Sequence, residues 1–152
     1  MTRTHIPRAP LLLGLSGLLP FIWGAATHLA PEIGAPIAAL LGIGFSGQAI
    51  LTAYGITILA FMSGTIWGFA TRSPNPAAIW GFALSVLPAL FGFFTFRAAP
   101  SLACLALAIG FAGLLTLDLR SQRLGEAPPW WLSLRFLLTS IVVLCLMVGA
   151  LG

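Results

Sequence analysis

Long runs of hydrophobic residues, separated by short polar or proline-containing segments, make up most of this chain. The longest run, residues 48–71, contains no charged side chain over its 24 positions and ends directly before Arg72. A helix of this length reaches about 36 Å, which exceeds the ~30 Å hydrocarbon core of a bilayer. The pattern therefore predicts a membrane-spanning helix in the middle of the chain.

The other hydrophobic runs predict four further spans, which makes five in all. We expect an all-α fold, a polytopic membrane helix bundle that forms a single transmembrane domain over residues 1–152. Pro20 and Pro88 interrupt two of the runs, and membrane helices accept such prolines when neighbouring groups bond the freed carbonyls. The expected spans are residues 11–29, 48–71, 77–96, 101–117 and 130–151.

Two segments leave a second interpretation open. Residues 31–47 are apolar, but glycines and prolines interrupt them, so we expect a loop with a short interfacial helix over residues 36–41. A sixth span is the alternative for this segment. The basic head at residues 1–8 and the leucine-rich run after it also fit a signal peptide. Because this run is longer than the usual apolar core of a signal peptide, we expect an uncleaved first span.

The composition supports a membrane protein. Hydrophobic residues make up 59% of the chain and charged residues only 7%, with a mean hydropathy of +1.06. A soluble domain carries about 25% charged residues, so this chain lacks the polar surface that it would need in water. The net charge of +4 comes from arginines that stand between apolar runs, without a basic stripe or a nucleic-acid-binding module. We therefore expect contact with membrane lipids and no nucleic acid partner.

The arginines also predict the orientation. With five spans, Arg97 alone falls on one side of the membrane, and all the other arginines fall on the opposite side. Positively charged residues gather on the cytoplasmic side of membrane proteins. We therefore expect a cytoplasmic N-terminus and a periplasmic C-terminus. The arginines on the expected cytoplasmic side are Arg3, Arg8, Arg72, Arg120, Arg123 and Arg135.

Motifs for catalysis are absent from the sequence. The chain has no GxSxG, HExxH, phosphate-binding loop or dinucleotide-binding glycine pattern. Cys104 and Cys145 each stand alone in an apolar run, which is typical of buried, inert thiols. We expect a protein that is not an enzyme and that holds neither a cofactor nor a metal.

Small residues recur at a fixed spacing in the central run. Ala60, Gly64 and Gly68 lie four residues apart and would form a stripe along one side of a helix. Such a stripe lets the backbone of another helix approach closely, so we expect a helix-packing interface there.

Polar and aromatic side chains accompany the stripe. Tyr54, Ser63 and Trp67 lie in the same run and are candidate contacts for a ligand or a partner. They either form hydrogen bonds between helices or line a pocket for a quinone, a tetrapyrrole or a lipid tail.

Two charged constellations are also candidates. Arg135 lies inside the last expected span, where a charge is costly without a partner, and Asp118 at the end of the preceding span is on the same side. We expect Arg135 to snorkel toward the membrane surface and to pair with Asp118 in the connection or with an anionic lipid; a site for an anionic ligand and a docking point for a partner subunit are the alternatives. His28 and Glu32 lie four residues apart and could relay protons or bind a metal on a continuous helix. Because Pro31 lies between them, we expect an ordinary interfacial pair instead.

Two stretches resemble a known family. IPRAPLLLGLSGLLPF at residues 6–21 and ILTAYGITILAFMSGTIWGFA at residues 50–70 are similar to small bacterial and mitochondrial membrane proteins of unknown function, which include the transmembrane protein 69 proteins of animals. The resemblance extends over nearly the whole chain. It implies a five-helix protein of the bacterial inner membrane, or of the mitochondrial inner membrane in eukaryotes, and it implies no activity. A histidine often precedes the Trp-Gly pair in this family, and this chain has Ile66 there, so no role of that histidine transfers.

Three functional hypotheses follow. Small size and short loops favour a non-enzymatic accessory or assembly subunit of a larger respiratory or photosynthetic complex, with other integral membrane subunits as partners. The alternative is a membrane protein that binds a hydrophobic small molecule in a pocket between helices, near Tyr54 and Trp67. A membrane-embedded enzyme is the third, and it would have to use one of the two charged constellations.

Overall fold

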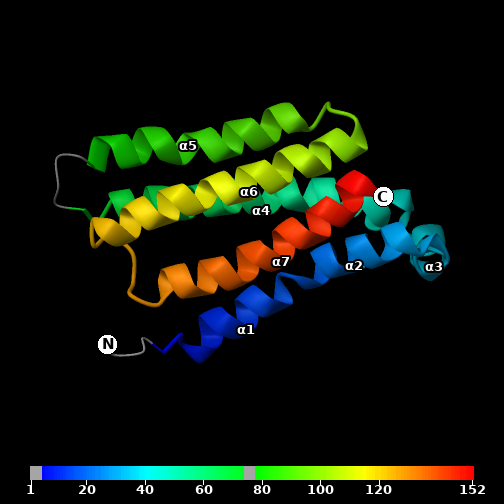
Figure 1. Ribbon diagram of the computed structural model, residues 1–152, viewed down its shortest axis with the longest axis horizontal. Helices are drawn as coiled ribbons and strands as arrows, with labels where there is room; N and C mark the ends of the chain where they lie inside the picture. Colours follow the sequence, from blue (N-terminus) through cyan, green and yellow to red (C-terminus); the bar gives the residue numbers. More distant parts are fainter. Residues whose placement is uncertain (1–4, 74–77) are drawn as a thin grey trace.

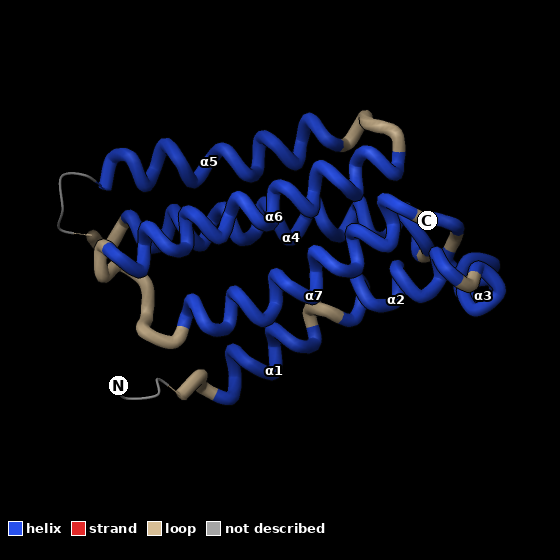
Figure 2. The backbone as a smooth tube through the Cα atoms, viewed as in Figure 1, coloured by secondary structure: helices blue, strands red, loops and turns tan. Residues whose placement is uncertain are grey.

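The computed structural model describes residues 5–73 and 78–152, and all regular structure in these ranges is helical (Figure 1, Figure 2). The first hydrophobic run forms two helices, α1 (Arg8–Ser16) and α2 (Leu19–Leu29), that follow roughly one course. They are separated by a turn directly before Pro20, which has no N–H to bond the carbonyl of the preceding turn. The interruption expected at this proline is therefore confirmed.

Four longer helices follow as antiparallel neighbours: α4 (Gly47–Ala70), α5 (Ala78–Thr95), α6 (Pro100–Arg123) and α7 (Trp131–Leu151). Helix α4 is central, because it packs against α2, α5, α6 and α7. In Figure 1, α5 lies along one side of the bundle and α1 and α2 lie along the other side, next to α7. The central helix predicted from the sequence is confirmed, with bounds that differ by one residue at each end.

The core lies between α2, α4, α6 and α7. Two glycines allow the helices to approach closely there, because an added Cβ at Gly24 or at Gly149 would lie only 2.7 Å from the side chain of Leu51. Glycine therefore sets the spacing of α2 and α7 against α4. The largest side chains that are fully buried are Phe21, Leu51, Leu59, Leu107, Phe111, Leu114 and Leu146.

Helix α6 extends beyond the expected span. We predicted a helix over residues 101–117 and a polar connection after it, but α6 continues to Arg123. Leucine, arginine and glutamine favour helix, and Arg120 and Arg123 in the last turn interact favourably with the helix dipole. The helix ends before Gly125, whose φ of +70° suits a residue without a side chain. Asp118 is therefore helical and does not lie in a loop.

Residues 31–47 form a short helix, as expected, although it is longer than residues 36–41. Helix α3 (Pro31–Leu41) has proline at its first position, which suits the start of a helix, and it ends at Gly42 with a φ of +100°. A single 3₁₀ turn, η1 (Ile43–Phe45), leads into α4. Figure 1 shows α3 nearly end-on, so it crosses the end of the bundle and does not run along it.

Within residues 5–73 and 78–152, four helical units are long and apolar enough to cross a membrane, namely Arg8–Leu29 taken together, α4, α6 and α7. Helix α5 has 18 residues. It reaches about 27 Å and is shorter than those four. The chain is thus a multi-pass helical membrane protein, while five spans and the orientation of the termini stay predictions.

Candidate functional site

A buried ion pair joins α6 to α7 near one end of the bundle. Arg135 Nε donates to Asp118 Oδ2 at 2.9 Å, and Trp131 Nε1 donates to Asp118 Oδ1 at 2.7 Å. Asp118 is 0% exposed and Arg135 is 4% exposed. The turn between α6 and α7 places Asp118 and Arg135 each about 7 Å from the end of its helix, so the two charges meet at one depth. The predicted pairing of these residues is confirmed.

The local electrostatics follow from this burial. A carboxylate out of water needs hydrogen-bond donors, and here each of its oxygens receives one. The negative charge of Asp118 and the positive charge of Arg135 cancel, so the site has no net charge. Removing one partner would leave an uncompensated charge in a medium of low dielectric constant, which is strongly unfavourable.

Hydrogen bonding around the pair is nevertheless incomplete. Arg135 Nη2, Thr139 Oγ1 and Ser121 Oγ are buried and have no hydrogen-bond partner among the residues that the structure describes. Most buried polar atoms in proteins are paired, so these unpaired atoms call for an explanation. Thr139 lies one helical turn after Arg135 on α7, and Ser121 lies three residues after Asp118 on α6.

A cavity lies beside this pair, between α1, α2, α4, α6 and α7. Its volume of about 370 Å³ is in the range of small-molecule sites. Arg135, Thr139 and Tyr54 are its main polar lining residues, and most of the others are apolar. The apolar lining includes Leu13, Leu18, Phe21, Ile58, Phe61, Met62, Phe111, Leu138 and Val142. The arrangement is a largely apolar chamber whose lining residues include Arg135 and Thr139.

The structure brings only part of the predicted central cluster to this cavity. Tyr54 lines it and packs edge-on against Phe21, with ring centroids 5.1 Å apart. Ser63 is buried elsewhere, where its hydroxyl donates to the Ser85 carbonyl of α5. Trp67 is half exposed, so the pocket that we predicted near both Tyr54 and Trp67 is wrong in its second residue.

The stripe of Ala60, Gly64 and Gly68 faces away from the rest of the chain. All three residues are exposed, and an added Cβ at Gly64 or Gly68 would meet nothing within 4 Å in the part that the structure describes. Helix α5 packs on a neighbouring side of α4, through contacts such as Trp67 with Phe82. The stripe therefore packs against no described helix of this chain, and its packing against a second protein stays a prediction.

His28 and Glu32 do not form a pair. Helix α2 ends at Leu29 and α3 begins at Pro31, so the chain changes direction between the two residues. Glu32 is exposed and has no ion pair with His28, and no group of three or more metal-binding side chains occurs among the described residues. Because α3 begins at Pro31, His28 and Glu32 are not on one continuous helix, and their four-residue spacing does not place them on the same face.

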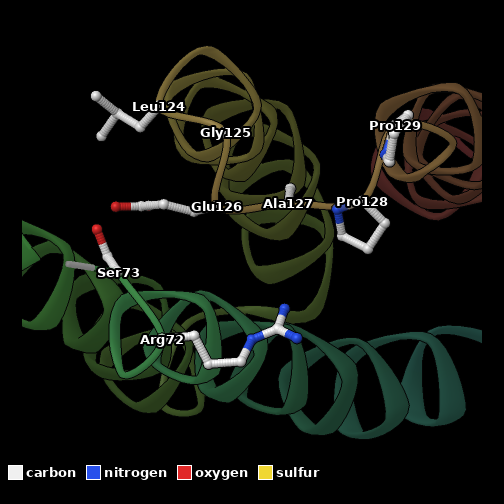
Figure 3. A pocket seen from close by; sticks show the side chains of 8 residues that line it. All are labelled: Arg72, Ser73, Leu124, Gly125, Glu126, Ala127, Pro128 and Pro129. Atoms are coloured by element: carbon white, nitrogen blue, oxygen red, sulfur yellow. The ribbon is translucent and has the colours of Figure 1, made fainter. Parts of the chain in front are cut away.

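A second cavity of about 440 Å³ lies at the same end of the bundle as the ion pair, between the end of α4 and the connection from α6 to α7. Figure 3 shows Arg72 and Glu126 on opposite sides of it. Exposed residues such as Leu124, Gly125 and Pro129 form much of its wall. We regard it as a surface hollow and not as the site.

Sequence reasoning missed the roles of Trp131 and Thr139. Both lie four residues from Arg135 on α7, so the three side chains share one face of that helix. This spacing around a charged residue within a span is the signal that would have found them.

Comparisons with known proteins agree with the family resemblance. Residues 6–151 match the family described as "Protein of unknown function (DUF3429)". Transmembrane protein 69 of Xenopus tropicalis is 32% identical to this chain over 149 residues. The match covers 95% of this chain and 54% of that relative, so the chain spans about half of the relative's length. No solved structure matches.

Proposed function

Because this chain belongs to the DUF3429 family of proteins of unknown function, we propose a function from the geometry of its cavity. The protein binds an apolar small molecule between α1, α2, α4, α6 and α7, and it acts without catalysis. One observation carries the proposal. Arg135 and Thr139 line the cavity, are 4% and 2% exposed, and each has a polar atom without a partner among the described residues.

The physical argument is one of cost. A buried donor without a partner costs about 1–3 kcal/mol, and more when it is charged. A bound molecule with a suitable polar atom removes this cost, and its apolar part fills a chamber that would otherwise lack contacts. The alternative is that buried water molecules alone form hydrogen bonds to these atoms, which is common in proteins.

Mass spectrometry of the purified protein tests this proposal. We expect one apolar molecule per chain to remain bound after purification in mild detergent. Gly17→Leu should displace it, because an added Cβ at Gly17 lies 3.8 Å from the Tyr54 hydroxyl, and Tyr54 lines the cavity. Gly64→Leu is the matched control, since a side chain there meets nothing within 4 Å.

The expected result is a bound molecule in the wild type and in Gly64→Leu, and none in Gly17→Leu. Equal occupancy in all three proteins, or a wild type that binds no apolar probe at all, would refute the proposal. Circular dichroism checks that both variants keep their helices.

A second candidate function is that of an accessory subunit in a larger complex. The uncovered stripe of Ala60, Gly64 and Gly68 favours it, because small residues on an outer face allow a helix of another protein to pack there. Gly64→Leu with Gly68→Leu should abolish co-purification of a partner from native membranes and leave the melting of the isolated chain unchanged. Recovery of only the free monomer or homo-oligomer from native membranes would exclude this role.

For the setting we propose five spans in the bacterial inner membrane, with α5 as the third span and a cytoplasmic N-terminus. The support comes from the described arginines. Arg8, Arg72, Arg120 and Arg123 lie at the end of the bundle where α1 begins, and Arg97 lies at the other end. Labelling of single cysteines from each side of spheroplasts tests the orientation. Labelling at both termini from the same side would contradict it.

A further inference from the structure

We propose that the head group of the ligand is an uncharged hydrogen-bond acceptor, a carbonyl oxygen, on a long apolar tail. This inference rests on the proposed function, because it names the class of ligand for the same cavity. The head accepts hydrogen bonds from Arg135 and Thr139, and the tail lies along α7 toward the middle of the membrane.

Charge balance gives the first reason. Among the described residues that line the cavity, Arg135 is the one with a charge. The carboxylate of Asp118, in an ion pair with Arg135, already neutralises that charge. An anionic head would give the buried site a net negative charge, and a cationic head would face the guanidinium. Both are costly where water is excluded, whereas an uncharged head is not.

Hydrogen-bonding capacity gives the second reason. A guanidinium donates hydrogen bonds and never accepts them, so the orphaned Nη2 of Arg135 requires an acceptor. Both oxygens of Asp118 already accept a bond, from Trp131 and from Arg135. A head that only donates would leave the Nη2 of Arg135 without an acceptor, whereas a carbonyl oxygen provides one.

The shape of the cavity gives the third reason. On α7 its lining extends from Trp131 to Val142. Trp131 and Val142 are eleven residue steps apart, which corresponds to about 16 Å along the helix; this is long for a compact molecule and suits a chain. Beyond Thr139 the described lining is mainly aliphatic and aromatic, with Tyr54 as the exception. A tail there gains the transfer and packing energy of apolar burial.

The rim of the cavity indicates how such a ligand enters. Leu13 on α1 and Phe61 on α4 both line the cavity and are among the exposed large hydrophobic residues of the chain. The opening therefore faces the outside of the bundle, where acyl chains surround a membrane protein. A molecule dissolved in the bilayer can enter sideways between α1 and α4 without crossing the aqueous phase.

Two sources in a membrane share this chemistry, a prenylated quinone and an ester-linked neutral lipid. Decylubiquinone and dioctanoylglycerol serve as probes for them, and dodecanoate and dodecyltrimethylammonium are the anionic and cationic counterparts. Binding of each to the purified full chain in detergent is measured by native mass spectrometry with a dilution series. We expect at least one uncharged probe to bind about tenfold or more tightly than either ion.

Thr139→Val tests the head-group contact, because valine keeps the shape and removes the hydroxyl. Binding of the preferred uncharged probe should weaken about 3–10-fold, the effect of one neutral hydrogen bond. Ser140→Ala is the matched control, since the exposed Ser140 hydroxyl donates to the Phe136 carbonyl away from the cavity. Equal affinity in the two variants would overturn the assigned contact.

Asp118→Asn tests the charge argument. The variant leaves Arg135 unbalanced, so the site becomes positive and dodecanoate should gain about tenfold or more in affinity while the uncharged probe changes little. If this variant does not fold, the comparison of probes on the wild type and on Thr139→Val decides alone.

The outcomes separate the two proposals. Tighter binding of dodecanoate than of both uncharged probes to the wild type would overturn this inference and leave the proposed function standing. Failure of all four probes would overturn the proposed function itself. Preference between decylubiquinone and dioctanoylglycerol identifies which of the two sources the cavity accepts.

Discussion

The two ends of the bundle are joined by different kinds of contact. Where α6 leads into α7, the buried charges of Asp118 and Arg135 meet at 2.9 Å. At the other end, Gln48 Nε2 at the start of α4 donates to the Gly149 carbonyl near the end of α7 at 2.6 Å. The first contact joins two charges, and the second joins two neutral groups.

This difference explains why we propose the site beside the ion pair. The neutral contact satisfies a backbone carbonyl that has no partner at a helix end, and nothing further is required of it. Each oxygen of the Asp118 carboxylate receives one hydrogen bond, but Arg135 keeps a donor that no described residue accepts from. A charged group with spare hydrogen-bonding capacity beside an apolar cavity is the basis of the ligand that we propose.

The largest expected effect is that of Asp118→Ala. Removing the carboxylate leaves Arg135 buried without a counter-charge and should lower the free energy of unfolding by about 3–5 kcal/mol. Reversible unfolding in mixed micelles, followed by circular dichroism, measures it. The double variant with Arg135→Leu should recover much of the loss, and a double variant as unstable as the single one would contradict the ion-pair account.

Trp131→Phe should have the next largest effect. The ring and its edge contact with Phe69, at 5.2 Å between centroids, can be kept, but the N–H that donates to Asp118 is lost. A hydrogen bond to a charged group contributes about 1.5–3 kcal/mol, so we expect a loss of that size in the same unfolding assay. Trp130→Phe is the control, and an equal loss in both variants would show that ring packing dominates.

Gln48→Leu probes the neutral end. It removes the bonds from Nε2 to the Gly149 carbonyl and to Ser101 Oγ, and it should cost about 1–2 kcal/mol, less than the loss of the ion pair. A measured loss larger than that of Asp118→Ala would reverse the ranking of the two ends.

Glu32→Gln should have the smallest effect. The side chain is exposed on α3, and substitutions at such positions usually change stability by less than about 0.5 kcal/mol. A loss above 1 kcal/mol, on the order of a hydrogen bond, would show that Glu32 has a structural partner after all.

The hydrophobic pattern predicted most of the fold because each long apolar run has one way to satisfy its backbone in lipid, the helix. Asp118 and Arg135 could be paired from the sequence because a short connection between antiparallel helices brings their adjoining ends together. The end of α6 was misplaced because polar residues suggested a loop, although their helix propensity is high.

Long-range packing could not be predicted. Gly24, Gly149, Gly64 and Gly68 look alike in the sequence, but the first two face Leu51 and the last two face outward. Which side of a helix is covered depends on where its neighbours lie, and periodicity does not contain that information. The pocket predicted near Tyr54 and Trp67 was right only at Tyr54 for the same reason, since five helices contribute to the wall of the cavity.

The central claim is that Arg135 holds a spare, buried donor that a ligand engages. Nitrogen-15 NMR of the arginine side chains in the full chain, recorded with and without decylubiquinone and dioctanoylglycerol, tests it most directly. The account predicts that the Arg135 resonances shift and that its N–H protons exchange more slowly when an uncharged probe binds. The resonances of the other six arginines should stay in place. A probe that binds while the Arg135 signals remain unchanged would contradict the account.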